Sequence, residues 1–144
     1  MDPTLCSRSI VAGALSPDEQ TAVSEHITAS QHWVLGAYEF LRTLCDRLNV
    51  DDLEKTPEDV RQWAEDVKRR FARLRMPLAK LEPASKYSKA DWSAAKPGML
   101  AGKGVCWKVN ETTTISRIEL SDALLEVLEF RRAAFSRWRA QNPD

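Results

Sequence analysis

The sequence predicts a mainly α fold, with three long helices in an antiparallel bundle and a small β-hairpin and irregular cap before the last helix. Three observations predict it. Apolar residues recur at steps of three and four along three long stretches, which is the spacing of an amphipathic helix. Each stretch is preceded by residues that favour a helix start. Before the third stretch, β-branched and aromatic residues gather around a turn signal, as they do in hairpins.

The domain organisation follows from the length of the chain. A chain of 144 residues is the size of one ordinary domain and can bury its own core. We expect residues 1–15 to form a flexible N-terminal arm and residues 16–144 to form a single helical domain. Within that domain, the irregular cap and the hairpin occupy about residues 83–118.

The first helix is expected to begin at Ser16. Ser16 suits the N-cap position, Pro17 suits the first helical position, and Glu19 is placed to complete a capping box. Only Gly36 interrupts the pattern before about Asn49. We therefore predict one long, continuous helix.

The second helix is expected to begin with Thr56 as its N-cap, followed by Pro57. Its apolar residues continue at helical spacing straight through Pro77. We therefore predict one helix to about Glu82, kinked near Pro77, where the ring clashes with the carbonyl group four residues earlier. The alternative is a helix that stops at Met76 and is followed by a further helical turn.

The cap and the hairpin form the least regular part of the chain. Residues 83–104 are punctuated by prolines and glycines, and a short helix capped by Ser88, with Asp91 three residues on, fits within them. The stretches "GVCWKV" and "TTTISRIEL" flank Asn110 and Glu111, which predicts a hairpin. Asn110 tolerates positive φ but Glu111 suits a tight turn poorly, so a longer loop fits equally well.

The last helix has two candidate starts. It begins near Ser121, or near Ser116 if the residues from Ser116 to Glu119 form a capping box. It then runs to about Ala140.

The first helix carries an apolar arc about twice as wide as that of the second helix. A helix of this kind must be covered from several directions. We predict a homodimer, because a two-fold axis lets one apolar face pack on its own copy and because small residues allow a close approach. The alternative is a monomer in which this helix is the central one. The candidate interface residues are Trp33, Gly36, Ala37, Phe40 and Leu44.

Charge and cysteine content exclude several classes of protein. The 21 basic and 21 acidic side chains cancel, so no overall field attracts the chain to nucleic acid or to an anionic membrane. No apolar stretch reaches the ~20 residues that span a bilayer. The odd number of cysteines, three, fits neither a disulfide framework nor a metal-binding spacing. We expect a cytoplasmic protein without a membrane partner, and the composition argues against nucleic acid.

No stretch carries a complete catalytic motif. Glu25, His32, Glu39 and Asp46 recur every seven residues along one face of the first helix. Seven helical residues rise about 10.5 Å, whereas one metal ion needs ligands within ~2–2.5 Å of itself. We therefore expect no metal site, no cofactor and no catalytic residue.

Charged residues in apolar or aromatic surroundings are the candidates for ligand binding. Arg131 lies in the apolar stripe of the last helix and needs a carboxylate such as Glu39, an anionic ligand, or an extended conformation that reaches water. Five lysines and three aromatic residues alternate between Ala84 and Val109, a combination that can hold a nucleotide. Acidic residues on the second helix, Glu65 and Asp66, stand four residues before Arg69 and Arg70, which favours ion pairs between them. The candidate ligand-binding residues are Glu39, Lys103, Trp107 and Arg131.

Two function hypotheses result. The first is a helical interaction or regulatory module that self-associates and binds a protein partner, without catalysis. The alternative is a binding protein or enzyme for a small anionic or nucleotide-like molecule, with a pocket under the cap formed by residues 84–109.

Overall fold

The computed structural model describes residues 15–50 and 57–142. The elements in chain order are α1 (Pro17–Val50), α2 (Glu58–Ala79), a 3₁₀ helix (Ser85–Tyr87), β1 (Lys96–Leu100), β2 (Gly104–Lys108), β3 (Thr114–Ser116) and α3 (Arg117–Gln141). The chain is therefore mainly helical, with a small antiparallel sheet before the last helix, as predicted. The bundle arrangement and the single-domain organisation stay predictions. The N-cap Thr56 and residues 1–14 of the expected arm lie outside the described residues.

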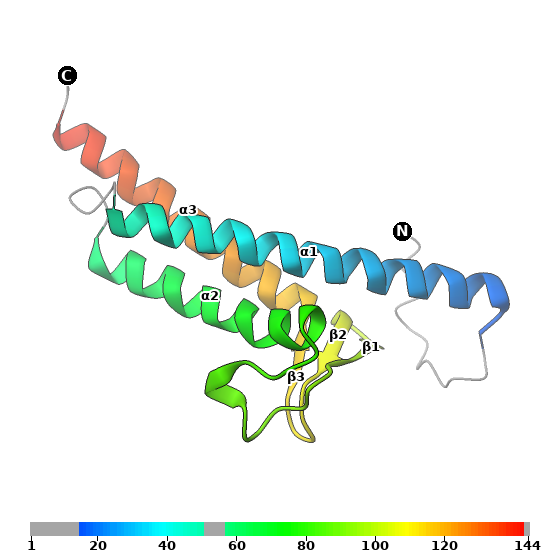
Figure 1. Ribbon diagram of the computed structural model, residues 1–144. Coiled ribbons are helices and arrows are strands. Elements are labelled where there is room, and N and C mark those ends of the chain that lie inside the picture. The colour runs from blue at the N-terminus through cyan, green and yellow to red at the C-terminus, as the bar shows by residue number, and fades with distance from the viewer. Residues whose placement is uncertain (1–14, 51–56, 143–144) are drawn as a thin grey trace.

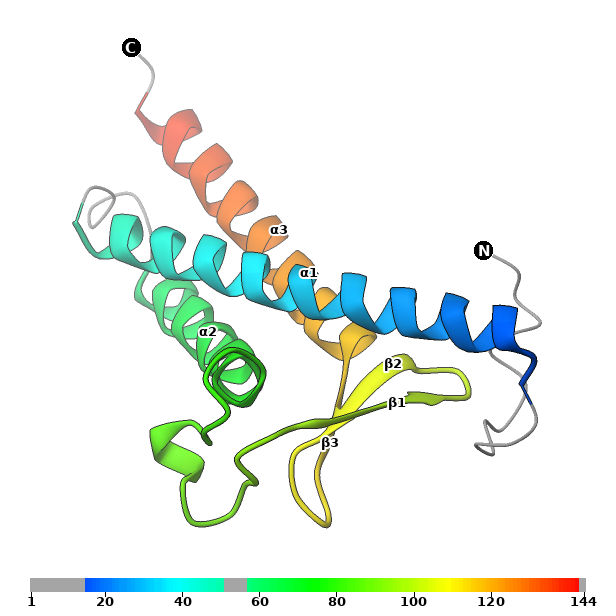
Figure 2. The ribbon, with the colours of Figure 1, turned by 45° about the vertical axis from the view of Figure 1, so that its right-hand side comes forward.

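The three helices differ in how closely they pack. Figures 1 and 2 show α2 along the C-terminal half of α1, while α3 crosses at an angle and its C-terminal end stands away from the other elements. The N-terminal part of α1 projects beyond the sheet, and none of its residues from Pro17 to Ala29 is buried. The core lies where the C-terminal half of α1 meets α2, the sheet and the first turns of α3.

The predicted start of α1 is confirmed by a capping box. The Glu19 backbone N–H donates to Ser16 Oγ at 3.3 Å, and the Ser16 N–H donates to Glu19 Oε2 at 2.8 Å. These two bonds satisfy donors that the first helical turn leaves without partners. The helix then continues through Gly36, as predicted, and ends at Val50.

Helix α2 continues through Pro77, so the alternative end at Met76 is wrong. The predicted end at Glu82 is wrong as well, because the helix stops at Ala79. The Lys80 N–H still donates to the Met76 carbonyl, but Leu81 adopts a positive φ of 55°. A left-handed residue cannot continue a right-handed helix, and Leu81 is exposed although it continued the apolar stripe of the sequence.

The predicted hairpin is confirmed as β2 and β3, joined by the longer of the two loops considered. The short helix expected after Ser88 is wrong. The chain turns there and then forms β1, an unpredicted strand that pairs with β2 and places Gly98 opposite Cys106. Pro97 is tolerated because β1 lies at an edge of the sheet. Gly102, at φ 73°, allows the turn between β1 and β2.

The core is built around large side chains from each element. Trp107 of β2, Phe71 of α2 and Leu41 of α1 are all fully buried. Burial of one such side chain contributes roughly 1.5–3 kcal/mol. The remaining buried members of this core are Val34, Ala37, Leu44, Cys45, Leu48, Ala64, Val67, Leu74, Val105, Val109, Leu120, Ala123 and Val127.

Helix α3 begins at the earlier of its two candidate starts. Ser116 is both the last residue of β3 and the N-cap of α3. The Glu119 N–H donates to Ser116 Oγ at 3.1 Å, and the Ser116 N–H donates to Glu119 Oε2 at 3.4 Å. This capping box joins the sheet directly to the helix.

We predict that Ser116→Ala destabilises the protein and that Ser121→Ala, the matched control, does not. Ser116 is buried and caps α3, whereas Ser121 is exposed within it. Loss of an N-cap costs about 1 kcal/mol and up to about 2 kcal/mol. Chemical denaturation of the two variants measures the difference. Equal free energies of unfolding would mean that the cap contributes nothing.

Candidate functional site

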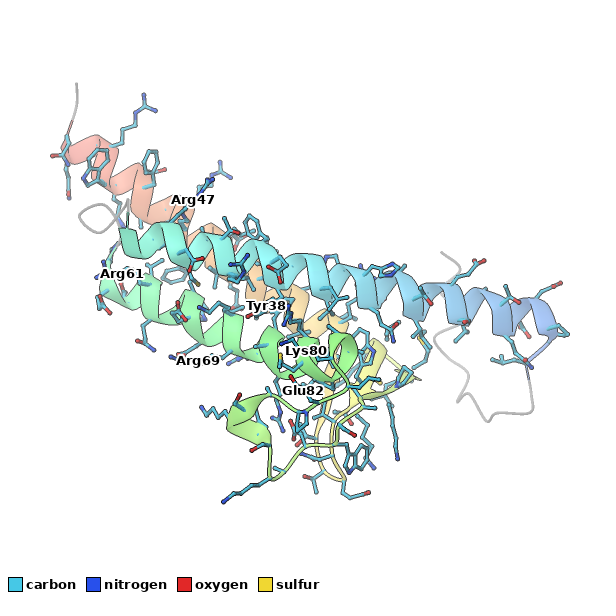
Figure 3. All side chains as sticks on the ribbon, in the orientation of Figure 1. Tyr38, Arg47, Arg61, Arg69, Lys80 and Glu82 are labelled. Atoms are coloured by element: carbon cyan, nitrogen blue, oxygen red, sulfur yellow. The ribbon has the colours of Figure 1, made fainter. Side chains whose placement is uncertain are left out.

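The four predicted ligand-binding residues lie on different elements. Glu39 is exposed on α1 and pairs with Arg42 at 2.9 Å and with Arg75 of α2 at 3.4 Å. The hydrogen bond from Arg42 and the nearby charge of Arg75 lower the pKa of Glu39. Beside this pair, Arg75 also lies 4.9 Å above the ring of Tyr38, which is labelled in Figure 3. Glu39 therefore connects α1 to α2 at the surface.

The other three candidates are also separated. Lys103 lies in the turn between β1 and β2 and pairs with Glu119 at 2.8 Å. Trp107 is fully buried in the core. Arg131 is half-buried and lines a hollow of about 270 Å³ on α3 together with Leu128, Arg132 and Phe135. This hollow contains one of the four candidates, and the pocket described below contains none.

The predicted dimer face on α1 is largely used within the chain. Ala37 and Leu44 are buried. Trp33 is half-buried, with its ring 5.7 Å from that of Phe71 and the Arg117 guanidinium 5.3 Å above it. Of the five predicted residues, Gly36 and Phe40 are the ones that stay exposed. The wide apolar arc is thus covered mainly by α2, the sheet and α3.

A buried ion pair, which the sequence did not reveal, fixes the cap to α2. The Asp91 side chain is only 1% exposed and accepts hydrogen bonds from Arg73 Nε at 2.7 Å and Arg73 Nη2 at 2.8 Å. Asn110 Nδ2 donates to the same carboxylate at 2.7 Å. The hydrogen bonds from Arg73 lower the pKa of Asp91, against the opposing effect of burial. The one sequence signal was that Asp91 is the single acid among the five lysines of the cap.

A pocket of about 180 Å³ lies beside this ion pair. It is formed between α2, the 3₁₀ helix, β3 and the first turn of α3. The Arg73 guanidinium at its edge lies 4.0 Å from the centre of the Tyr87 ring. Its lining residues are Arg70, Arg73, Tyr87, Thr114, Ile115, Glu119 and Leu120.

The outer face of α3 exposes apolar side chains at regular spacing. Ile118, Leu125 and Phe135 are 48%, 54% and 50% exposed, and Leu128 is half-buried. Large apolar side chains in a row on a surface are typical of a contact with another molecule. The predicted dimer face lies on α1, and the exposed apolar row on α3 was not predicted, because the helical wheel of α3 also contains the apolar stripe that faces the core.

Comparisons of the chain with protein-family models, with curated proteins and with solved structures found no match. Within residues 15–50 and 57–142, no group of three or more His, Cys, Asp or Glu side chains is placed to hold a metal ion. Among the described helices, none has the length and apolar character needed to cross a membrane.

We predict that the Arg73–Asp91 pair makes stability depend on pH below about 4. The folded-state pKa of Asp91 lies below the usual aspartate value of 3.8. Its ionised form therefore contributes stability at higher pH, and the contribution is lost as the pH falls through the lowered pKa. Asp91→Asn should cost roughly 3 kcal/mol at neutral pH, because it leaves Arg73 without its counter-charge.

The measurement is the free energy of unfolding from pH 7 to pH 2 for the wild type and for Asp91→Asn. The difference between the two should shrink toward acid pH. Asp66→Asn is a matched control, since Asp66 forms an exposed pair with Arg69. A difference that stays constant over the whole range would contradict the role assigned to the Asp91 charge.

Proposed function

We propose that the protein is a helical interaction module that self-associates through the outer face of α3. Two copies of α3 pack side by side in opposite directions around a two-fold axis. The observation that carries the proposal is the row of exposed apolar side chains on this helix. Three further features of α3 support it: the spacing of these apolar residues, the order of acidic and basic residues, and the lack of ion pairs at most of its charged residues.

The spacing is that of a helix–helix seam. Ile118, Leu125 and Arg132 are seven residues apart, and Leu128 and Phe135 alternate with them at steps of three and four. This is the 3.5-residue period that keeps one stripe of a helix facing a partner helix. At 1.5 Å per residue, the 25 residues of α3 form a rod roughly 38 Å long.

The order of charges along α3 makes it complementary to a reversed copy of itself. After Arg117, the acids Glu119, Asp122, Glu126 and Glu129 all precede the bases Arg131, Arg132, Arg137 and Arg139. A parallel copy would set acid against acid. A reversed copy, with the two-fold axis between Leu125 and Leu128, sets Ile118 opposite Phe135 and brings Asp122 within one residue of the position opposite Arg132, which is the self-complementarity that a two-fold axis requires.

Most charged residues of α3 also lack an ion-pair partner among the described residues. In the part of the chain that the structure describes, six of them form no ion pair, even though Glu129 and Arg132 stand at a spacing that allows one. Helix α2 differs, because five of its six basic residues are paired. The six unpaired residues of α3 are Asp122, Glu126, Glu129, Arg132, Arg137 and Arg139.

We predict that Leu125→Glu converts the dimer to a monomer, because it places a charge at the centre of the apolar seam. Sedimentation velocity over a concentration series measures the dissociation constant, and circular dichroism checks that helicity is unchanged. Phe40→Glu is the matched control, since Phe40 is 48% exposed on α1 and Leu125 is 54% exposed on α3. The control should stay dimeric.

The possible outcomes distinguish a dimer interface on α3 from one on α1. A dimer lost in Phe40→Glu and kept in Leu125→Glu would place the interface on α1 and contradict the proposal. A wild type that stays monomeric at about 100 μM would contradict self-association at useful affinity and leave the helix of another protein as the occupant of this face.

A charge exchange tests the antiparallel direction. Asp122→Arg and Arg132→Glu should each weaken the dimer about tenfold, since the two-fold axis repeats every pair and each pair contributes up to ~1 kcal/mol. The double variant carries both changes and should recover most of the affinity. Failure of the double variant to recover any affinity would exclude this register.

A further inference from the structure

We propose that the pocket between α2, the 3₁₀ helix, β3 and the first turn of α3 binds the phosphate group of a small molecule. The site does not depend on the self-association proposed above. Glu119 and Leu120 line the pocket, whereas Ile118 and Leu125 lie on the outer face of α3. The ligand class follows from the hydrogen-bond donors and the size of the pocket.

Arg70 supplies a cation that has no partner among residues 15–50 and 57–142. The other basic residues of α2 each pair with a carboxylate: Arg61 with Glu58, Lys68 with Glu65, Arg69 with Asp66, Arg73 with Asp91 and Arg75 with Glu39. In the described part of the chain, Arg70 forms no ion pair or hydrogen bond. The sequence predicted a pair between Asp66 and Arg70, which is wrong because the Asp66 carboxylate binds Arg69 at 2.8 Å. Arg70 thus lines the pocket without a counter-charge from the described residues.

Arg73 supplies a second guanidinium, held in a fixed orientation. Its Nε and Nη2 atoms bind Asp91, and its plane lies over the Tyr87 ring. The N–H groups of Nη1 form no hydrogen bond to the described residues. A guanidinium held on one side by a carboxylate and on its face by an aromatic ring loses little entropy when it binds an anion on its remaining side.

Neutral donors and an apolar wall complete the pocket. Thr114 and Tyr87 line it, and their hydroxyl groups have no hydrogen-bond partner among the described residues. Ile115 and Leu120 form the apolar wall. Two guanidinium groups and two hydroxyl groups match the several acceptor oxygens of a phosphate, which binds arginine through charge-assisted hydrogen bonds.

Glu119 is the one acid in the lining, and its charge is already matched. Its Oε1 accepts from Lys103 Nζ at 2.8 Å and its Oε2 accepts from the Ser116 N–H. The hydrogen bond from Lys103 lowers the pKa of Glu119, so the carboxylate stays ionised and bound to Lys103. The arginine side of the pocket therefore determines which ligands it attracts.

The pocket is small for a whole nucleotide. Sites for drug-sized ligands occupy about 300–1,000 Å³, whereas this pocket measures about 180 Å³. A phosphate group with a short carbon chain against Ile115 and Leu120 fits this size. The same donors would bind free inorganic phosphate. A comparison of the affinities for inorganic phosphate and for a phosphate attached to a short carbon chain distinguishes the two ligands.

The test is a titration of the ¹⁵N-labelled full chain followed by amide chemical shifts. The ligands are inorganic phosphate and glycerol phosphate, at ionic strength held constant with sodium chloride. We expect saturable shifts at the amides of Arg70, Tyr87 and Thr114. Arg70→Ala should weaken binding about tenfold or more, since it removes a charge-assisted contact.

Arg75→Ala is the matched control, because Arg75 is another arginine of α2, pairs with Glu39 of α1 and does not line the pocket. It should bind as the wild type does. Tighter binding of glycerol phosphate than of inorganic phosphate would mean that the apolar wall contacts the carbon chain of the ligand. Equal binding would mean that the site recognises the free phosphate anion alone. No saturable shift at about 10 mM of either ligand, or an equal loss in Arg75→Ala and Arg70→Ala, would overturn the proposal.

Discussion

The ion pair between Arg73 and Asp91 is the interaction on which the irregular segment between α2 and β1 depends. The chain from Lys80 to Ala95 contains one 3₁₀ helix as its regular structure, and its apolar residues contribute little to the core. A carboxylate that is 1% exposed is costly unless it is fully hydrogen-bonded. Arg73 and Asn110 provide those bonds from α2 and from the hairpin loop, so that one group fixes three segments relative to one another.

The packing of α1 determines what remains for contacts with other molecules. Its C-terminal half is covered by α2, the sheet and α3, and this cover includes two of the side chains that the sequence pointed to as a dimer face, Ala37 and Leu44. Because α3 crosses α1 at an angle, it uses one stripe for the core and leaves the opposite one exposed (Figure 2). Among the described residues, four of the seven exposed large apolar side chains therefore lie on α3: Ile118, Leu125, Phe130 and Phe135.

Sequence reasoning succeeded where the structure is decided locally. The capping boxes at Ser16 and Ser116 depend on residues three positions apart, and the long periodic helices depend on spacing alone. It failed where a distant contact decides. Strand β1 contains Pro97 and Gly98, which disfavour strands, and it forms because β2 offers an unpaired edge.

The candidate site shows the same limit more sharply. Arg69 and Arg70 are neighbours of the same type, and each has an acid four residues before it. Side-chain rotamers on the helix surface decide that Asp66 pairs with Arg69 and not with Arg70. The pocket that Arg70 lines also needs Thr114, which is distant in sequence. Neither could be deduced from spacing along one helix.

The two proposed surfaces use opposite sides of α3, and this follows from the helix geometry. At 100° per residue, Glu119 lies roughly 150° around the helix from the middle of the seam between Ile118 and Phe135. A second copy on the outer face therefore leaves the pocket open. The same helix that buries Leu120 and Val127 in the core thus has room for a ligand beside its first turn and for a partner along its length.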